Sequence, residues 1–268
     1  MQAKKPIGIF DSGIGGLTVA SAIRSVLPNE PVIYFGDTAH MPYGDKSPEA
    51  IKYYSLKITK FLIDQGCKAI VIACNTASSL AFHDLQDFLG GHLPIYNVID
   101  PVVQRMVADD RLKRIGVIAT KATIDSDIYA RKIKDVDPGR EVAQLATPLL
   151  APMIEEGFFN NTISQTVIEE YLSSPVLRDI DGLILACTHY PLIRKEIDAF
   201  FGGQISIADN GIATAEFLRE ELGRLDLLNS EAGFTDHFFV SDYTQSFESS
   251  TRIFFGDRIR LEKKDIWM

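Results

Sequence analysis

The sequence predicts an α/β protein with two similar lobes related by pseudo-two-fold symmetry, each a mostly parallel sheet flanked by helices. Short apolar runs rich in β-branched residues recur along the 268 residues, and they do not alternate apolar with polar side chains. Strands buried on both faces of a parallel sheet have this pattern. Amphipathic helical stretches separate the runs, and strand–helix alternation through a whole chain indicates the α/β class.

The strands are expected at eight apolar runs, in chain order: Ile7–Phe10, Val32–Phe35, Ala69–Ala73, Ile95–Ile99, Ile115–Ala119, Val142–Ala146, Leu183–Ala186 and Ile205–Ala208. Each run is four or five residues long, which is an ordinary strand length. Because a continuous apolar run has no polar face, helices must cover these strands from both sides.

The helices between the strands carry their own start signals. Ser47 can act as an N-cap, and Pro48 suits the first helical position. Five apolar residues then recur at helical spacing and share one face: Ile51, Tyr54, Ile58, Phe61 and Leu62. A second helix is expected to begin in the same way at Asn161 or Thr162.

Composition excludes several classes of partner. The formal net charge is −9, and a nucleic-acid-binding surface needs clustered Lys and Arg, so we expect no nucleic-acid partner. The first apolar run is too short for a signal peptide, and no stretch approaches the roughly 20 apolar residues of a membrane span. The three cysteines, Cys67, Cys74 and Cys187, form no CxxC pair. Reduced thiols and a cytoplasmic location are therefore expected.

Two weak cues suggest that the chain crosses between lobes near Asp100–Pro101 and again near Asp209–Gly211. An Ala-Cys element recurs on either side of the first crossing. The pair FDSG (10–13) and ADNG (208–211) each ends a strand and opens a helix with an acid and a glycine. A diverged internal duplication would explain both repeats.

The glycine-rich turn DSGIGG (11–16) follows the first strand. It is not the dinucleotide-binding fingerprint, because Thr18 stands where the last glycine of that motif must be. The turn still allows a carboxylate or a phosphate to approach the backbone closely. The alternative is a tight turn in which Asp11 or Ser12 is the N-cap of a helix.

Two cysteines stand at the ends of strands with hydrogen-bonding residues behind them, in VIACNTASS (71–79) and ILACTHYPL (184–192). A helix N-terminus lowers the pKa of a thiol, and His189 could orient Cys187 or exchange protons with it. The alternative is that Cys74 and Cys187 are inert apolar residues and His189 is structural. Cys67 fits only this inert role, because nothing reactive surrounds it in the sequence.

A metal site is a competing interpretation of the same residues. Cys74, Cys187, His189 and His40 could form a Cys2His2 set, but structural zinc sites take ligands from closely spaced pairs. These thiols lie far apart in the sequence, so we expect no metal. A pair of thiols from two similar halves instead suits inversion of a stereocentre, where one group removes a proton from one face and the other delivers a proton to the opposite face.

At this point the chain resembles a known family, the bacterial glutamate racemases, which are cofactor-independent amino-acid racemases. The resemblance rests on four motifs in order: IGIFDSGIGGLTV (7–19), YFGDTAHMPYGDKS (34–47), VIACNTASS (71–79) and ILACTHYPLI (184–193). Further segments agree more loosely: PMIEEG (152–157), DNGIATA (209–215) and FFVSDYTQSFESSTRIFFG (238–256). Nearly the whole chain is covered.

The resemblance implies specific roles. Cys74 would deprotonate D-glutamate and Cys187 L-glutamate, while Asp11 and His189 assist proton transfer. Glu155 matches an auxiliary acid, although it could equally be an ordinary charge on a helix. The residues implied to hold the substrate are Asp11, Ser12, Tyr43, Gly44, Asn75, Thr76, Thr188 and His189.

The resemblance also implies an architecture and a biological role. Residues 1–99 with 210–268 would form the first lobe and residues 100–209 the second, with the active site in the cleft between them. No cofactor, pyridoxal phosphate included, is implied. The family is often homodimeric and supplies D-glutamate for bacterial peptidoglycan.

Some positions depart from the family pattern. His40-Met41 stands where many members have a basic and a smaller aliphatic residue, and Asn210 replaces a commoner serine. Only six residues precede the first expected strand, so we expect no dependence on the cell-wall precursor that activates members with an N-terminal extension.

Three alternative functions stay open on the sequence. The first is racemisation of aspartate or another amino acid, although related aspartate racemases carry an acid where this chain has His189. The second is a non-catalytic amino-acid-binding module with structural thiols. The third is thiol redox chemistry, which would form a disulfide between Cys74 and Cys187.

Overall fold

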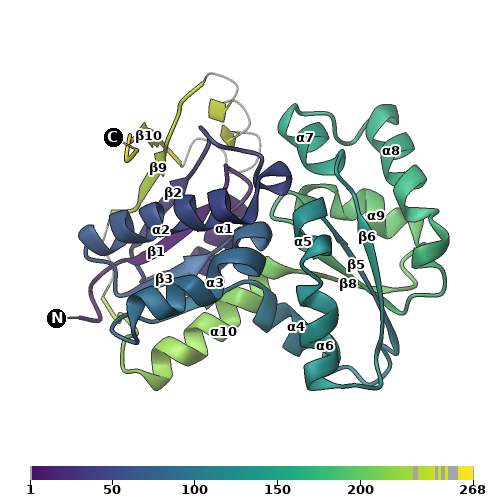
Figure 1. Ribbon diagram of the computed structural model, residues 1–268, viewed down its shortest axis with the longest axis horizontal. Coiled ribbons are helices and arrows are strands. Elements are labelled where there is room, and N and C mark those ends of the chain that lie inside the picture. Colours follow the sequence, from purple (N-terminus) through teal and green to yellow (C-terminus); the bar gives the residue numbers. More distant parts are fainter. Residues whose placement is uncertain (1, 232–234, 245–246, 249–250, 253–258, 268) are drawn as a thin grey trace.

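The computed structural model describes residues 2–231, 235–244, 247–248, 251–252 and 259–267, and it consists of two α/β lobes side by side (Figure 1). The first lobe holds a six-stranded sheet of order β10-β9-β2-β1-β3-β4, and the second a four-stranded sheet of order β6-β5-β7-β8. Every pair of neighbouring strands is parallel. The predicted fold class is confirmed.

The strands lie where the apolar runs predict them. Their bounds are β1 Ile7–Asp11, β2 Val32–Gly36, β3 Ala69–Ile72, β4 Ile95–Asn97, β5 Arg114–Ala119, β6 Glu141–Ala146, β7 Gly182–Ala186, β8 Ser206–Asp209, β9 His237–Val240 and β10 Leu261–Lys263. The prediction was wrong at Ile99, which begins a helix because Asn97 Oδ1 accepts the N–H groups of Ile99 and Asp100. The sequence did not predict β9 and β10. Within the tail motif 238–256, residues 245–246, 249–250 and 253–256 lie outside the described part.

The α-helices are α1 Leu17–Val26, α2 Pro48–Asp64, α3 Asn75–Leu89, α4 Ile99–Val107, α5 Lys121–Asp125, α6 Ile128–Val136, α7 Leu150–Glu155, α8 Thr162–Leu172, α9 Arg194–Phe200 and α10 Asn210–Arg224. Three short 3-10 helices are η1 Tyr43–Asp45, η2 Pro175–Leu177 and η3 Tyr190–Ile193. Ser47 and Asn161 cap α2 and α8, as predicted. No helix in the described part of the chain is both long enough and apolar enough to cross a membrane.

The two sheets repeat one strand order. β2-β1-β3-β4 in the first lobe corresponds to β6-β5-β7-β8 in the second, so β3, before Cys74, corresponds to β7, before Cys187. The FDSG and ADNG segments are not equivalent in this way, because they follow β1 and β8. They share only a local contact, in which the aspartate accepts the N–H of the glycine two residues on, at 3.1 Å for Asp11 and 3.0 Å for Asp209.

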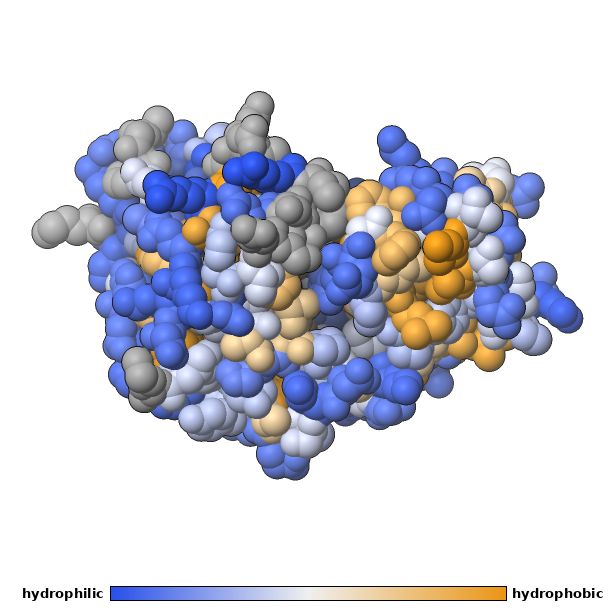
Figure 2. Space-filling model, turned by 90° about the horizontal axis from the view of Figure 1, so that it is seen from above, coloured by the Kyte–Doolittle hydropathy of each residue, from blue (hydrophilic) through white to orange (hydrophobic). Residues whose placement is uncertain are grey.

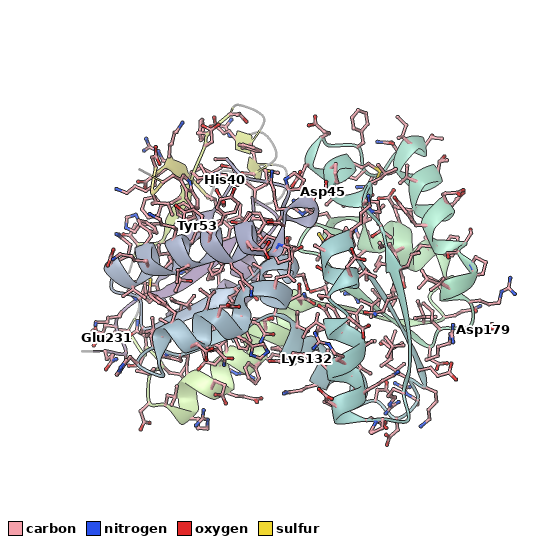
Figure 3. All side chains as sticks on the ribbon, in the orientation of Figure 1. His40, Asp45, Tyr53, Lys132, Asp179 and Glu231 are labelled. Carbon is pink, nitrogen blue, oxygen red and sulfur yellow. The ribbon has the colours of Figure 1, made fainter. Side chains whose placement is uncertain are left out.

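The chain crosses between the lobes at the starts of α4 and α10, which pack against each other on one side of the molecule (Figure 1). Ala213 of α10 lies in the core of the second lobe, whereas Ala215 and Leu218, one turn further on, lie in the core of the first. On the same side, Lys132 of α6 forms a 2.5 Å ion pair with Asp100 of α4 (Figure 3). Because α10 belongs to both cores, it ties the two lobes together.

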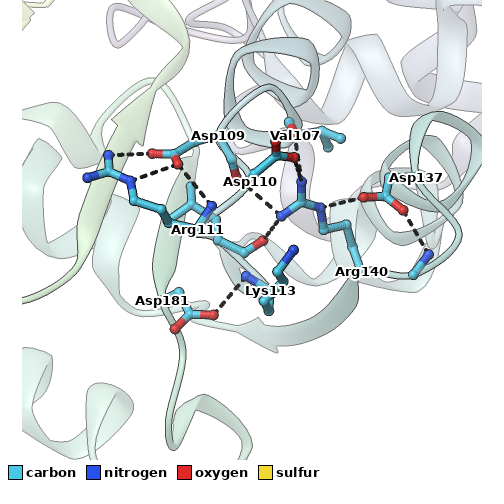
Figure 4. A network of polar contacts seen from close by, with 10 residues as sticks. Val107, Asp109, Asp110, Arg111, Lys113, Asp137, Arg140 and Asp181 are labelled. Atoms are coloured by element: carbon cyan, nitrogen blue, oxygen red, sulfur yellow. Dashed lines mark hydrogen bonds and ion pairs between the residues drawn. The ribbon is translucent and has the colours of Figure 1, made fainter.

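Arg140 lies at the amino ends of the strands of the second lobe, opposite the carboxyl ends (Figure 4). Its guanidinium donates to the Val107 carbonyl at 2.9 Å and also to the Leu112 carbonyl. The Asp137 carboxylate accepts from Nε at 2.7 Å. Arg140 is 3% exposed, so one buried side chain satisfies the end of α4 and the turn that leads into β5.

Lys68 and Glu30 form a fully buried ion pair at the corresponding end of the first lobe. Lys68 Nζ also donates to the carbonyl of Ala3 at 2.5 Å and to that of Leu227 at 2.7 Å. Glu30 accepts the N–H of Asn229 at 2.7 Å. Four segments distant in sequence therefore meet at one charge pair.

Replacement of Lys68 by methionine is expected to lower the free energy of unfolding by about 3–5 kcal/mol, because it leaves the Glu30 carboxylate buried without its counter-charge. The control is Lys60→Met, which removes an exposed ion pair with Asp64 and is expected to change stability by about 0.5 kcal/mol or less. Urea titration measures both. A loss below about 1 kcal/mol for Lys68→Met would contradict this account of the buried pair.

Candidate active site

One small cavity lies between the lobes at the carboxyl ends of both sheets. Its volume is about 30 Å³, which holds roughly two water molecules. The first lobe contributes Ser12, Pro42, Tyr43, Gly44, Cys74, Asn75 and Thr76, and the second contributes Thr120, Ala151, Glu155, Ala186, Cys187, Thr188 and His189. These residues follow β1, β2, β3, β5, β6 and β7, so the cavity lies where α/β sheets usually bind ligands.

The structure brings together every site residue that the sequence indicated except Asp11, which lies behind the cavity wall. It adds Pro42, Thr120, Ala151 and Ala186, which the sequence analysis did not single out. Thr120 could have been found, because it directly follows a strand, as Ser12 does. Its hydroxyl lies 2.9 Å from that of Thr76 in the other lobe.

Cys74 is the N-cap of α3, with the N–H of Ala77 donating to its Sγ at 3.4 Å. Its thiol lies 3.6 Å from the Ser12 hydroxyl. Burial, together with the negative charge of Asp11, raises the pKa of the Cys74 thiol to about 12. The expectation of a lowered pKa was therefore wrong for Cys74. The backbone N–H at the helix N-terminus does lower the pKa, but desolvation raises it by more. At neutral pH the group is therefore a thiol.

Asp11 organises the glycine-rich turn. Its Oδ2 accepts the N–H groups of Gly13 at 3.1 Å and Gly16 at 2.9 Å. A Cβ on Gly16 would collide with the Cβ of Asp11, so the turn needs glycine there. α1 begins at Leu17 with Gly16 at its N-cap, so neither Asp11 nor Ser12 is the cap. Burial raises the pKa of Asp11, although His189 and the two N–H groups oppose this effect.

Cys187, His189 and Glu155 form a chain of contacts in the second lobe. His189 Nδ1 lies 3.7 Å from Cys187 Sγ, and Nε2 lies 3.0 Å from Glu155 Oε1 in an ion-pair contact. Burial disfavours the charged imidazole, but the Glu155 carboxylate and the contact with Cys187 raise the pKa of His189 well above its ordinary value. The histidine can therefore hold a positive charge beside the thiol.

The carboxylate of Asp37 binds side chains of the loop between β2 and α2. It accepts from the hydroxyl of Tyr43 at 2.7 Å and from that of Ser241 at 2.8 Å. It also contacts His40 Nδ1 at 2.9 Å. His40 stacks on Tyr54 and does not line the cavity, so the structure does not assemble the Cys2His2 set considered from the sequence. Within the described ranges, no other group of three or more His, Cys, Asp or Glu residues is placed to hold a metal ion either.

The two thiols reach one cavity from corresponding strand ends, and their surroundings differ. Cys74 has a carboxylate nearby, whereas Cys187 has an imidazole. No Lys or Arg is among the residues that line the cavity, so hydroxyls, an amide and backbone N–H groups are the donors for an anionic ligand. This arrangement can place one proton-transferring sulfur on each side of a small polar molecule.

Comparisons with known proteins agree with this picture. A sequence model of the Asp/Glu/Hydantoin racemase family matches residues 17–218. The glutamate racemase of Geobacter metallireducens is 43% identical over 257 residues, covering 95% of this chain and 94% of that protein. The crystal structure of glutamate racemase from Francisella tularensis in complex with D-glutamate superposes with a TM-score of 0.92 at 39% identity, covering 99% of each chain. An aspartate racemase homologue from Pyrococcus horikoshii shares the fold alone, with a TM-score of 0.56 at 20% identity over 82% of this chain and 99% of that one.

The Asp11→Asn substitution is expected to lower the pKa of Cys74, because it removes a negative charge that raises this pKa. The asparagine oxygen can still accept the N–H groups of Gly13 and Gly16. Alkylation of Cys74 by iodoacetamide at pH 9 should accelerate roughly threefold to tenfold, as measured by peptide mass spectrometry.

Cys67 provides the internal control for this experiment. Burial raises its pKa to about 12, but Asp11 has no part in that shift, so its alkylation rate should stay the same. An unchanged or slower rate at Cys74 would contradict the electrostatic role assigned to Asp11.

Proposed function

The chain belongs to the Asp/Glu/Hydantoin racemase family, and from this premise we propose that it is a glutamate racemase that interconverts L- and D-glutamate without a cofactor. The observation that carries the proposal is that Cys74 and Cys187 line one cavity from corresponding strand ends of the two lobes. Relatives of about 40% identity over nearly the whole chain are named glutamate racemases, which favours glutamate over aspartate.

We propose a two-base mechanism. Cys74, as thiolate, removes the Cα proton of D-glutamate, and the Cys187 thiol delivers a proton to the opposite face of the carbanion. The reverse reaction exchanges the two roles. Each turnover from D- to L-glutamate thus leaves a proton on Cys74 and removes one from Cys187. Cys74 must lose its proton and Cys187 must regain one before the next turnover in the same direction.

Asp11, His189 and Glu155 are proposed to support these transfers. His189 contacts Cys187, so a charged imidazole would stabilise its thiolate, and Glu155 would in turn stabilise the imidazolium. Asp11 lies behind Cys74 and raises its pKa, which makes the thiolate a stronger base once it forms. The two sulfurs, which are proposed to act on opposite faces of the substrate, therefore have different neighbours.

Substrate recognition is proposed to rest on neutral donors. Hydroxyls of Ser12, Thr76 and Thr188, the amide of Asn75 and the segment Tyr43–Gly44 surround the cavity, with Asp11 behind it and His189 at its wall. The N-terminus of α3 adds a favourable field for a carboxylate. Because the cavity of about 30 Å³ is much smaller than glutamate, the lobes must separate to admit it. The boundaries we propose for these lobes are 1–99 with 210–268, and 100–209.

We further propose that the enzyme works in the bacterial cytoplasm and that its D-glutamate supplies peptidoglycan synthesis. All three cysteines are free thiols, which suits a reducing compartment. The two glutamate racemases named above come from bacteria.

A homodimer is the proposed assembly. Figure 2 shows an apolar patch on the second lobe, over the region where α7 and α8 lie. In and beside these two helices, Leu149, Phe158 and Ile163 are exposed, with 59%, 46% and 56% of their surfaces accessible. Apolar patches of this kind mark interaction surfaces.

Substitution of either reactive thiol tests the mechanism. Cys74→Ser and Cys187→Ser should each lower the racemisation rate by more than about a thousandfold, because a serine hydroxyl is a far weaker base than a thiolate at neutral pH. Both variants should still bind glutamate in calorimetry. Circular dichroism with each enantiomer measures the rate, and Cys67→Ala, remote from the cavity, should stay active.

Three outcomes would contradict the proposal. Undiminished racemisation by either serine variant would exclude the two-thiol mechanism. Faster turnover of aspartate than of glutamate by the unmutated protein would change the substrate. No turnover of any amino acid, with binding intact, would favour a non-catalytic binding module.

The assembly is tested by light scattering coupled to gel filtration. The unmutated chain should elute at the mass of two copies, and Ile163→Asp should shift it towards one copy, because a charge in an apolar interface is costly. Lys60→Ala, on an exposed face of the other lobe, serves as the control. A single-copy mass for the unmutated chain at micromolar concentration would contradict a stable homodimer.

A further inference from the structure

The side-chain amide of Asn75 accepts hydrogen bonds from two residues that do not line the cavity. Its Oδ1 accepts from the hydroxyl of Tyr129 at 2.6 Å and from Nδ2 of Asn210 at 2.5 Å. The three side chains come from different elements, since Asn75 begins α3, Tyr129 lies in α6 and Asn210 begins α10. All three are buried, with exposures of 3%, 0% and 3%.

These contacts use only one branch of the amide. Oδ1 has two donors, whereas Nδ2 of Asn75 is a buried donor without a hydrogen-bond partner among the described residues. Asn75 itself lines the cavity. Because the two branches of a planar amide diverge, partners gathered on Oδ1 leave Nδ2 free for an acceptor bound in the cavity. An unpaired buried N–H is unfavourable, and a ligand oxygen that accepts from it would remove this cost.

We propose that Tyr129 and Asn210 are positioning residues of the racemase, which fix the Asn75 amide so that its Nδ2 donates to a carboxylate of the substrate. The inference rests on the proposed function, because it takes the ligand to be an amino dicarboxylate. Tyr129 and Asn210 act through Asn75 and do not touch the substrate.

The opposite orientation of this amide would oppose binding. It would point the partial negative charge of Oδ1 at a carboxylate, in a cavity that no Lys or Arg lines. Burial raises the pKa of Tyr129, so its hydroxyl stays protonated and can donate. The fixed orientation therefore supplies a neutral donor in a cavity whose cationic side chain, His189, is already engaged with Cys187 and Glu155.

The geometry also connects recognition to the crossing between the lobes. Asn210 is the first residue of the helix that returns the chain to the first lobe, and Tyr129 belongs to the second lobe. Asn75 belongs to the first lobe, so its amide is held in this way only when the two lobes and the crossing helix are assembled as observed here.

Two substitutions test the inference in the full-length protein. Tyr129→Phe keeps the ring and removes one donor to Asn75 Oδ1. Asn210→Asp replaces the other donor by a carboxylate, which attracts Nδ2 and turns Oδ1 towards the cavity; a negative charge at the first residue of α10 is otherwise well tolerated. Tyr96→Phe is the matched control, because it removes a buried hydroxyl without a hydrogen-bond partner among the described residues.

For Tyr129→Phe we expect KM to rise roughly 5- to 20-fold for both glutamate enantiomers, with kcat within about twofold. For Asn210→Asp we expect a larger rise, of roughly 10- to 100-fold, that shrinks as the pH is lowered. Protonation gives the introduced carboxyl group an O–H that can again donate to Asn75. The unmutated enzyme and Tyr96→Phe should not show this recovery.

Unchanged KM in Tyr129→Phe, or a fall in kcat with KM unchanged, would overturn the inference. The inference would also be overturned if the KM of Asn210→Asp matched that of the unmutated enzyme at every pH. The Asn75 amide would then already direct its Nδ2 towards residue 210 in the unmutated protein. If Asn210→Asp does not fold, Tyr129→Phe decides alone. An unmutated protein inert towards glutamate would instead contradict the proposed function, so the two failures are distinguishable.

Discussion

The site depends on one constraint: two parallel sheets of the same strand order direct their carboxyl ends at a single cavity. In a parallel sheet all strand ends of one kind lie on one edge, so residues that directly follow different strands are brought together. Ser12, Cys74 and Cys187 follow β1, β3 and β7, and they meet although they are distant in sequence. The crossing helix α10, shared between the two cores and packed against α4, keeps the two edges facing each other.

Burial then sets the chemistry of the groups that meet there. The pKa of the Cys74 thiol rises because the thiol is buried and Asp11 lies nearby. The pKa of His189 rises against the same desolvation, because Glu155 supplies a compensating charge. The two halves of the site therefore share a backbone plan but differ in the charge beside each sulfur. The proposed two-base mechanism can use this difference, because in it each sulfur acts as acid in one direction and as base in the other.

Much of the fold and of the site could be predicted from the sequence, because the informative residues follow local rules. All eight apolar runs form strands, as predicted. The residues that line the cavity just after strand ends include Cys74, Cys187, Ser12 and Thr188. Apart from the strand end at Ile99, which the neighbouring Asn97 decides, the errors arose where a distant partner decides. β9 pairs with the free edge of β2, about 200 positions away in the sequence, and β10 then pairs with β9. The pKa of Cys74 depends on burial and on Asp11, neither of which the helix N-terminus reveals. Tyr129 carries no motif at all and becomes relevant only through its contact with Asn75.

The most direct test of the account is the fate of the Cα hydrogen when each glutamate enantiomer is incubated with the purified protein in D2O. Two sulfurs on opposite faces predict that the newly formed enantiomer carries deuterium at Cα from its first appearance, while the remaining starting enantiomer stays unlabelled early in the reaction. Mass spectrometry after chiral separation reads both pools. Product that retains the original hydrogen would mean that one group serves both faces, and the facing pair of cysteines would then have no part in the inversion.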